Sequence, residues 1–522
     1  MRKVNYLLAG LATLFMASCS NEESPSNNGG NGADGKASYL AVRIANPTGT
    51  RADSDYEYGE GAETEVKSIV FYLFDKNGAA FPLKDETDPT RDFNKVQTLD
   101  DDGNPTDPVP GEGSGAEIEN IYNPTLVIKH EKGEIPAYMV AIVNKDLGEK
   151  VANIDELRGM LSAEYGDQTS FVMSNAITEG GLLTPITAAN LAETIELAKA
   201  NPVRINVERV LAKVRTKLTN ANETTTWDTG ETADGTATGK KLYARLDGWT
   251  VTNTASDAYL IKNVKDINSQ NAWAGWSAGD RSFWANTDRV TVSKYQTPYN
   301  AIGNPDRMYL MENTDQDNPT TVMVKATLVN EDGNPVSLAR WNGLQYPNLD
   351  EELTKLKTAM LVFLKGQGKL PWVGTAAGKR EMGISDFRFK TNADKKWRVN
   401  PVPVEGSAFY ATSDADTAMT EAEVNAVFAM LGTAMIWTDG QTLYHTTIKH
   451  SVDGAPEGLT GVVRNHIYDV QIAGVQGLGI PVFDPEEVYD PEDPEYTASS
   501  LYAEVSILAF RIVINNPILG GE

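Results

Sequence analysis

The feature of this chain that most constrains its fold is a series of short runs that either alternate apolar and polar residues or are rich in β-branched residues. Leu40, Val42 and Ile44 occupy every second position of the first run, which places them on one face of a strand. A stronger run over residues 66–74 closes on the turn-forming residues 75–78. Such runs, separated by Asn, Asp, Gly and Pro, are typical of β-sandwiches, so we expect a mostly β fold. Further runs lie at residues 126–129, 137–143, 170–174, 203–218, 241–246, 322–329, 385–390, 442–449 and 462–472.

The length of 522 residues is enough for at least two domains. Residues 219–239 are rich in Thr, Asn and Gly and contain almost no apolar side chains, which predicts a linker. We therefore expect one β-sandwich over residues 52–218 and a second over residues 240–522. Short helices are predicted at residues 154–163 and 188–199 of the first domain.

Two helices are better marked in the second half. In the first of these helices, the apolar residues lie on one face. The second helix begins with a capping box formed by Thr420 and Glu423. The apolar positions are Leu349, Leu353, Leu356 and Met360 in the first, and Val424, Val427, Phe428 and Leu431 in the second. Residues 484–495 form an acidic linker spaced by prolines, and a β-rich tail follows it.

The N-terminal residues 1–19 have the pattern of a bacterial lipoprotein signal peptide. A positive start precedes a short apolar run, and residues 16–19 end this run with small residues before Cys19. The apolar run is too short to span a bilayer, so a transmembrane anchor is the weaker alternative. We expect Cys19 to be acylated and to become the new N-terminus. The Ser, Asn and Gly residues up to residue 35 predict a flexible tether.

The charge of the chain excludes some classes of partner. Residues 1–51 hold five Lys and Arg against three Asp and Glu, which leaves 41 against 69 in the remainder. This acidic balance argues against nucleic acid or an anionic membrane surface as a partner. Cys19 is the only cysteine, so we expect a fold without disulfides that is held by packing alone.

Few residues have the arrangement that catalysis or metal binding requires. The histidines His445 and His450 stand an odd number of residues apart in a strand-like run, so zinc binding is disfavoured. The acidic turn at residues 100–104 offers calcium ligands without the spacing of a known calcium loop, and a solvated loop is the favoured interpretation. Trp273, Trp276 and Trp284 cluster around Arg281 as a candidate sugar platform, although core or loop anchors are the commoner role. We expect no enzyme and no cofactor.

Several segments together resemble the fimbrillin family, the subunits of type V pili in Bacteroidales-type bacteria. The resemblance follows the family order along nearly the whole chain and is greatest to the major subunit of short (minor) fimbriae. It implies two transthyretin-like Greek-key β-sandwich domains, a few short helices and a structural role in a surface fimbria that supports adhesion. The segments are Ile69–Asp75, Ala141–Asn144, Phe171–Asn175, Val207–Val214, Arg281–Ala285, Val463–Val470, Gly477–Gly479 and Asp484–Pro485.

The resemblance also implies a second removal step. In the family, an arginine-specific surface protease cuts the lipidated precursor in the loop after the first strand, and the matching bond here joins Arg51 to Ala52. Residues 20–51 would then be a propeptide that contains the tether and the first strand. The Gly, Pro and Thr residues before Arg51 favour an exposed, cleavable loop. The alternative is that Arg51 is a loop arginine without this role.

Loss of the first strand predicts a polymerisation switch. Removing Leu40, Val42 and Ile44 exposes an apolar groove and unpaired backbone groups, which are a template for another strand. Burying three such side chains is worth on the order of 5–9 kcal/mol. A strand of an identical subunit can fill the groove by donor-strand exchange, and a head-to-tail contact of this kind produces a filament.

The candidate donor lies in the C-terminal tail. Apolar residues alternate over 501–507, and the phase then shifts, so that Phe510, Ile512 and Ile514 line the other parity. The shift predicts a first segment that belongs to the second domain and a last segment that is donated. The alternative is an ordinary last strand of the second domain.

The sequence thus predicts a fimbrial subunit that begins as an outer-membrane lipoprotein precursor and ends in extracellular fimbriae. Its expected partners are copies of itself, accessory fimbrial subunits, the arginine-specific protease, and surface ligands of host or bacterial origin. One rival is an accessory tip or anchor subunit of the same fimbria. Another is a surface glycan-binding lipoprotein that uses Trp273, Trp276 and Trp284.

Overall fold

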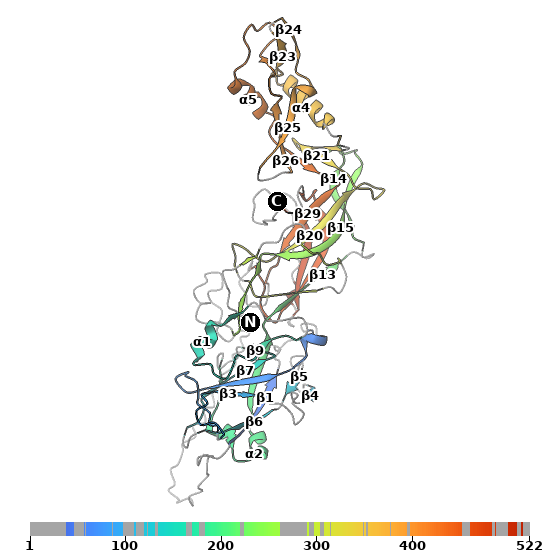
Figure 1. The fold of residues 1–522 in the computed structure, drawn as a ribbon. Coiled ribbons are helices and arrows are strands. Elements are labelled where there is room, and N and C mark those ends of the chain that lie inside the picture. The colour runs from blue at the N-terminus through green and yellow to red at the C-terminus, as the bar shows by residue number, and fades with distance from the viewer. Residues whose placement is uncertain are drawn as a thin grey trace, which may run out of the picture.

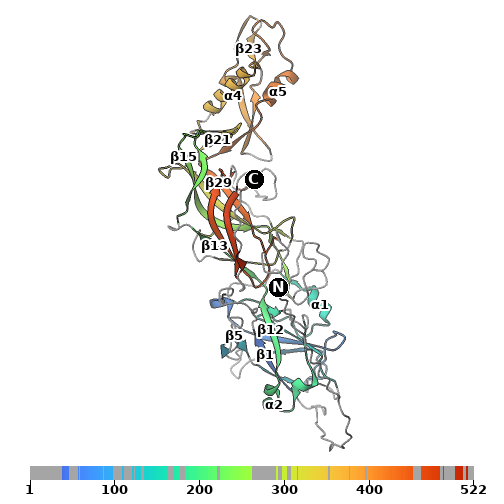
Figure 2. The same ribbon diagram turned by 180° about the vertical axis from the view of Figure 1, so that it is seen from behind.

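The computed structural model is mostly β, which confirms the fold class that the alternating runs predict. Figures 1 and 2 show an elongated molecule in which a first sandwich lies at one end, a second sandwich in the middle and a third unit at the far end. The structure describes residues 38–45, 57, 59–85, 87–97, 109–110, 120–122, 124–130, 134–162, 170–176, 183–219, 224–261, 290–291, 297–302, 307–313, 315–347, 349–350, 353–375, 377–393, 397–450, 460–482, 486, 500–508 and 513–514.

The first sandwich is built around β2 and β7, which pair antiparallel along their whole length. Ile69, Phe71 and Leu73 of β2 face one apolar cluster, and the residues between them face another. Both faces of β2 are therefore covered, which explains its unbroken apolar run. Its strands are β1 (Ser38–Ala45), β2 (Ile69–Phe74), β3 (Lys95–Gln97), β4 (Val109–Pro110), β5 (Asn120–Tyr122), β6 (Thr125–Ile128), β7 (Tyr138–Val143), β8 (Leu161–Ser162), β9 (Met173–Asn175), β10 (Thr184–Pro185), β11 (Leu191–Ala192) and β12 (Val203–Arg209). Its helices are α1 (Ile154–Gly159) and α2 (Ile195–Ala200), with 3-10 turns η2 (Gly61–Glu63) and η3 (Ala188–Asn190).

The second sandwich consists of two five-stranded sheets that share one apolar cluster. One sheet has the order β19-β13-β30-β32-β33 and the other the order β14-β15-β20-β29-β31. Val214 and Val470 from the first sheet meet Trp249, Val324 and Tyr444 from the second in this core, where each is at most 2% exposed. The ten strands of these sheets are β13 (Ala212–Leu218), β14 (Thr226–Thr232), β15 (Lys241–Thr252), β19 (Arg307–Leu310), β20 (Thr321–Val329), β29 (Gln441–Thr447), β30 (Ile467–Gln476), β31 (Ile480–Pro481), β32 (Ser500–Leu508) and β33 (Val513–Ile514). Outside these two sheets, β16 (Thr254–Ala255) pairs with β18 (Val290–Thr291), and β17 (Ala258–Tyr259) pairs with β8.

The third unit is inserted between β20 and β29 and has its own apolar cluster. Trp341 and Leu364 pack there with Phe387, Phe409 and Phe428. The sequence predicts the two helices of this unit but places them inside a single sandwich over residues 240–522. Its elements are β21 (Leu338–Trp341), β22 (Leu344–Pro347), α4 (Thr354–Gly366), β23 (Trp372–Thr375), β24 (Gly378–Glu381), η5 (Ile384–Asp386), β25 (Phe387–Thr391), β26 (Arg398–Pro403), β27 (Phe409–Tyr410), α5 (Glu421–Ala429) and β28 (Ala434–Trp437).

Several element boundaries differ from the sequence-based expectation. The segment expected as a linker, 219–239, contains β14, which pairs with β15. The run over 203–218 is divided into β12 in the first sandwich and β13 in the second, because the chain bends at Val210 and Leu211. The capping box of Thr420 and Glu423 is present at the start of α5. Helix α4 begins after Leu353, whose left-handed φ of 54° excludes it from the helix.

Candidate functional site

The first strand of the chain, β1, has partners on both sides. Its first half pairs antiparallel with β6 and β11, and its second half pairs parallel with β12 and antiparallel with β5. Leu40 lies opposite Leu126 and Leu191 and is fully buried. Strand β1 therefore fills a two-sided slot in the first sandwich, and it is not an edge strand.

The backbone register places the other predicted residues of this strand in the same slot. Val42 lies opposite Val203, and Ile44 lies between Ile205 and Tyr122. Strand β1 thus lies between β5 and β6, which precede β7 in the sequence, and β12, which is the last strand of the first sandwich. Among the described strands, β5 and β6 are joined to the rest of the first sandwich by their pairing with β1, and removal of β1 would break this pairing.

The C-terminal strands have a different placement. β32 pairs antiparallel with β30 from Ser500 to Leu508, and β33 pairs with β32 at Val513 and Ile514. Of the predicted donor residues, Ile514 therefore pairs within its own chain, opposite Ser506. The remaining predicted site residues lie outside the described part of the chain. They are Cys19, Arg51, Ala52, Phe510, Ile512, Trp273, Trp276, Trp284 and Arg281.

The joint between the two sandwiches is closed by apolar contacts. β17 of the second half pairs with β8 of the first, and Leu260 and Ile261 lie in an apolar cluster with Tyr72 and α1. Val463, which precedes β30, belongs to the same cluster. The two sandwiches are therefore packed against each other and do not meet only through a covalent linker.

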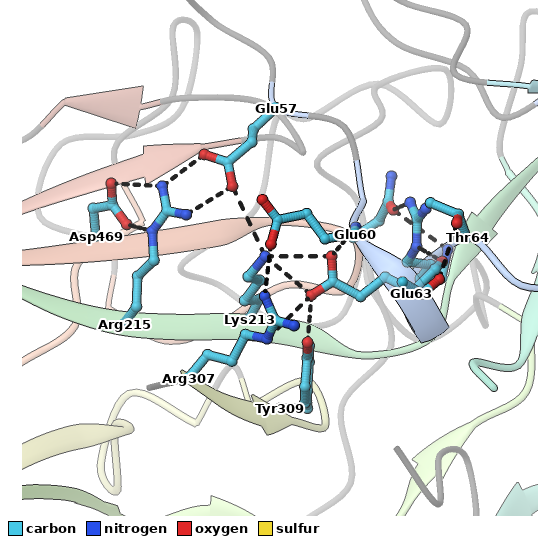
Figure 3. Close-up of polar contacts among 12 residues, drawn as sticks. Glu57, Glu60, Glu63, Thr64, Lys213, Arg215, Arg307, Tyr309 and Asp469 are labelled. Carbon is cyan, nitrogen blue, oxygen red and sulfur yellow. Dashed lines mark hydrogen bonds and ion pairs between the residues drawn. The ribbon is translucent and has the colours of Figure 1, made fainter. Parts of the chain in front are cut away.

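A group of charged residues, which we call the joint cluster, spans this contact: Glu57, Glu63, Lys213, Arg215 and Asp469 (Figure 3). Lys213 Nζ lies 3.0 Å from Glu63 Oε1, and each side chain is 1% exposed. Arg215 donates to both carboxylate oxygens of Glu57 at 2.7 Å and also bonds Asp469. The acids come from the segment before β2 and from β30, whereas both bases come from β13.

Burial and hydrogen bonding have opposite effects on the pKa of Glu63. Burial raises it, but the hydrogen bond from Tyr309 and the charge of Lys213 outweigh this effect, so the net result is a lowered pKa. The carbonyl of Glu63 also accepts a hydrogen bond of 2.7 Å from Arg209 Nε. Glu57 and Glu63 are thus fixed to β13 of the second sandwich by their side chains, and the backbone of Glu63 is fixed to β12 of the first sandwich.

A second buried ion pair reinforces the joint. Arg464 Nη2 lies 2.6 Å from Glu312 Oε2, and both side chains are completely buried. The same guanidinium donates to the carbonyls of Tyr259 and Leu260, the residues that reach into the first sandwich. A buried charge of this kind requires such partners, so the position of residues 259–260 is tightly constrained.

The sequence-based prediction missed the joint cluster, although one pattern in the sequence indicates it. Lys213, Arg215 and Lys217 alternate along one strand of an acidic chain, which places three cations on one face. Lys217 Nζ lies 2.6 Å from Asp469 Oδ2, so all three bond acids on that face. The acidic partners are about 150 and 250 residues away in the sequence, and no local pattern identifies them.

The described residues contain no group of three or more His, Cys, Asp and Glu that is placed to hold a metal ion. His445 lies in β29 and His450 follows it, and His450 Nδ1 is 2.9 Å from the Tyr468 hydroxyl in the core. Within the described part of the chain, no helix is long and apolar enough to cross a membrane.

No protein-family model matches the chain, and no curated protein matches its sequence. Its structure is similar to a proposed cell adhesion protein from Parabacteroides distasonis, with 14% identity, 92% of this chain and 98% of that chain covered, and a TM-score of 0.40. It is also similar to a fimbrilin from Porphyromonas gingivalis, with 12% identity, coverage of 90% and 96%, and a TM-score of 0.38. A C-terminally truncated tip fimbrial protein from the same species has 11% identity, coverage of 90% and 99%, and a TM-score of 0.29.

Proposed function

We propose that this chain is a structural subunit of a surface fimbria that polymerises by donor-strand exchange. On this proposal, the precursor is exported as a lipoprotein acylated at Cys19 and is cut between Arg51 and Ala52 by an arginine-specific protease. The donor is the C-terminal segment that contains Phe510, Ile512 and Ile514. The observation that carries the proposal is the placement of β1, because a strand with partners on both sides leaves a slot when it is removed.

The free energy of the exchange follows from this geometry. Loss of β1 leaves unpaired backbone groups on β6 and β11 and on β5 and β12, which a donated strand can satisfy from both sides. The donor also covers the apolar cluster that Leu40 covers in the precursor. An empty slot is unstable, so a cut subunit is driven to accept the strand of another copy.

The joint cluster defines what leaves after the cut. Glu57, five residues after Ala52, bonds Arg215, and Glu63 bonds Lys213. The new N-terminus would therefore stay attached to the second sandwich, while only the segment that carries β1 departs. Because the joint is retained, the two sandwiches keep a fixed position relative to each other, which a load-bearing stalk requires.

The test is the Arg51→Ala variant, expressed in a cell that makes the fimbria. We expect a folded, lipidated precursor at the outer membrane and no fibres by electron microscopy, whereas wild-type fibres should contain chains that begin at Ala52 by N-terminal sequencing. Arg91→Ala is the matched control, because Arg91 is an exposed arginine in another acidic loop, and it should leave fibres unchanged. Normal fibres from the Arg51→Ala variant would refute the proposed cut.

A further inference from the structure

The exposed apolar side chains lie at the two ends of the molecule. Among the described residues, seven large apolar side chains are at least 39% exposed, and none of them belongs to the second sandwich. They are Leu344, Val362 and Met430 in the third unit, and Val127, Ile135, Ile195 and Leu197 in the first sandwich. Single exposed apolar residues are ordinary, but a group of them in one place marks a contact surface.

The three residues of the third unit gather around Trp341. Leu344 lies opposite Trp341 in the β21–β22 hairpin. The carbonyl of the residue after Met430 accepts a hydrogen bond of 2.5 Å from Trp341 Nε1. Phe363, which follows Val362, lies edge-on to the Trp341 ring with 5.6 Å between the ring centroids. Because Trp341 contacts all three segments, Leu344, Val362 and Met430 lie close together, and we call them the Trp341 patch.

Three of the exposed residues in the first sandwich flank β1. Val127 of β6 lies opposite Tyr39 of β1, and on the other side of β1 Tyr39 lies opposite Ala192 of β11. Helix α2, which carries Ile195 and Leu197, follows β11 and packs against β1 and β6. Val127, Ile195 and Leu197 therefore lie beside the slot that β1 fills, and we call them the slot patch.

The two patches lie at opposite ends of the elongated molecule. The third unit forms one end, and α2 lies at the other end (Figures 1 and 2). β32 runs toward the joint, because its last residue, Leu508, lies opposite Ile467 at the start of β30. β33 is antiparallel to β32, so it runs back toward the third unit. The last described strand of the chain thus points toward the end that carries the Trp341 patch.

The charges of the two ends suit a head-to-tail contact. Residues 330–440, which form the third unit, hold 12 Lys and Arg against 14 Asp and Glu. Residues 52–211, which precede β13, hold 13 against 30. Two strongly acidic surfaces would repel each other, whereas a nearly neutral end can approach an acidic one. The first sandwich is therefore better matched by the third unit than by another first sandwich.

We propose that the Trp341 patch of one copy packs on the slot patch of the next copy in the fibre. This proposal rests on the proposed function, because a copy that donates its tail into the slot must approach the slot patch. The occupant of each patch is thus a second copy of this chain. The contact removes six large apolar side chains from water, and it joins successive subunits by a second connection besides the donated strand.

The experiment is thiol cross-linking in fibres. Cys19 is the only cysteine of the chain, and on the proposed function it leaves with the cut segment. The Val362→Cys/Leu197→Cys variant, expressed in a cell that makes the fimbria, therefore places the only two thiols of the mature chain in the two patches. A short bismaleimide should join the chains of sheared fibres into dimers and higher multimers on a denaturing gel. Met430→Cys/Val127→Cys provides a second pair.

Val362→Cys/Thr226→Cys is the matched control. Thr226 is exposed on β14 of the second sandwich, where no contact is proposed. This variant should give no more multimer than Val362→Cys alone. The two variants with a thiol in each patch should give about tenfold more, because docking holds the two thiols at a high effective concentration.

A charged substitution supplies an independent measurement. Val362 is 66% exposed, so Val362→Asp should leave the precursor folded while it places a carboxylate in the Trp341 patch. Fibres of this variant should be shorter than wild type by electron microscopy. Thr226→Asp adds the same charge to the second sandwich and should leave fibre length unchanged.

Two results would overturn the proposal while donor-strand exchange stands. The first is fibres of normal length from Val362→Asp, together with no multimer above the control from either pair of cysteines. The second is abundant multimer from Val362→Cys alone, because the Trp341 patch would then meet a copy of itself. By contrast, fibres of Arg51→Ala that still cross-link through the two patches would refute the proposed cut and leave the docking in place.

Discussion

Two strands near the ends of this chain, β1 and β32, are held in opposite ways. β1 has eight residues and pairs with four different strands, on both of its sides. β32 has nine residues and forms one long ladder with β30, and among the described residues Ser506 and Ile507 pair with β33 on its other side. The first is a central strand and the second lies near an edge.

The difference teaches which strand can act as a switch. Removal of an edge strand exposes one row of backbone groups, whereas removal of β1 exposes two rows and the core beneath Leu40. A strand that enters the slot recovers two ladders, but one that joins the open edge of β32 recovers only one. Exchange at the first sandwich is therefore favoured over simple edge pairing at the second.

The sharpest test of this asymmetry is deletion of all residues after Phe510. The truncated subunit keeps its slot but lacks the proposed donor, so we expect cleavage after Arg51 without fibres. Mixed with wild-type subunits, it should accept a donor strand and then end the filament, so fibres seen by electron microscopy should become shorter as its fraction rises. Fibres of normal length from the truncated protein alone would place the donor elsewhere.

The next largest effect is expected at the joint cluster. Glu63→Gln leaves Lys213 as a buried cation without its close carboxylate, since Glu57 is 3.8 Å away. Removing one partner of a buried pair typically costs about 3–5 kcal/mol, which denaturant unfolding of the precursor can measure. Fibres should also become less resistant to shear, because one of the contacts that join the two sandwiches is weakened.

Glu60→Gln is the matched control for this joint. Glu60 lies on the same short segment as Glu63, and its side chain is 69% exposed. Its Oε2 atom lies 3.1 Å from Nη1 of Arg307. An exposed pair of this kind contributes about 0–1 kcal/mol. Equal losses from the two variants would show that the joint cluster does not hold residues 57–63.

A substitution in β1 should have a smaller effect, and this effect should differ between the precursor and the fibre. Leu40→Ala empties a fully buried position of β1 and should lower the free energy of unfolding of the precursor by about 2–4 kcal/mol. Fibres made from this variant should be as stable as wild type, because residue 40 has left with the cut segment. Leu126→Ala, at the facing and equally buried position of β6, should weaken both forms. A weaker fibre from Leu40→Ala would mean that β1 stays in place.

The sequence predicted what is local and missed what is distant. Alternating or β-branched runs identified β1, β2 and β20, and the Thr420 capping box identified α5, because each signal lies within one element. The third unit was missed because its separation depends on β20 pairing with β29 across the insertion. Glu63 and Lys213 were missed for the same reason, since their contact joins positions 150 residues apart. The proposed cut and donor rest on sequence patterns and on the slot that surrounds Leu40.

The smallest expected effect is the pH dependence of the joint, and its sign follows from Glu63. The pKa of Glu63 is lowered in the folded chain from its usual value of 4.5, so the unfolded chain binds a proton more readily. The stabilisation is therefore complete above pH 4.5 and is lost as the pH falls through the lowered pKa. The free energy of unfolding, measured between pH 6 and pH 3, should decrease below pH 4.5. This decrease should be smaller in Glu63→Gln than in the wild type, and it should be the same in Glu60→Gln as in the wild type. An identical decrease in Glu63→Gln would assign the acid sensitivity to other carboxylates, and the joint would then resemble the pH-insensitive contacts of the apolar cores.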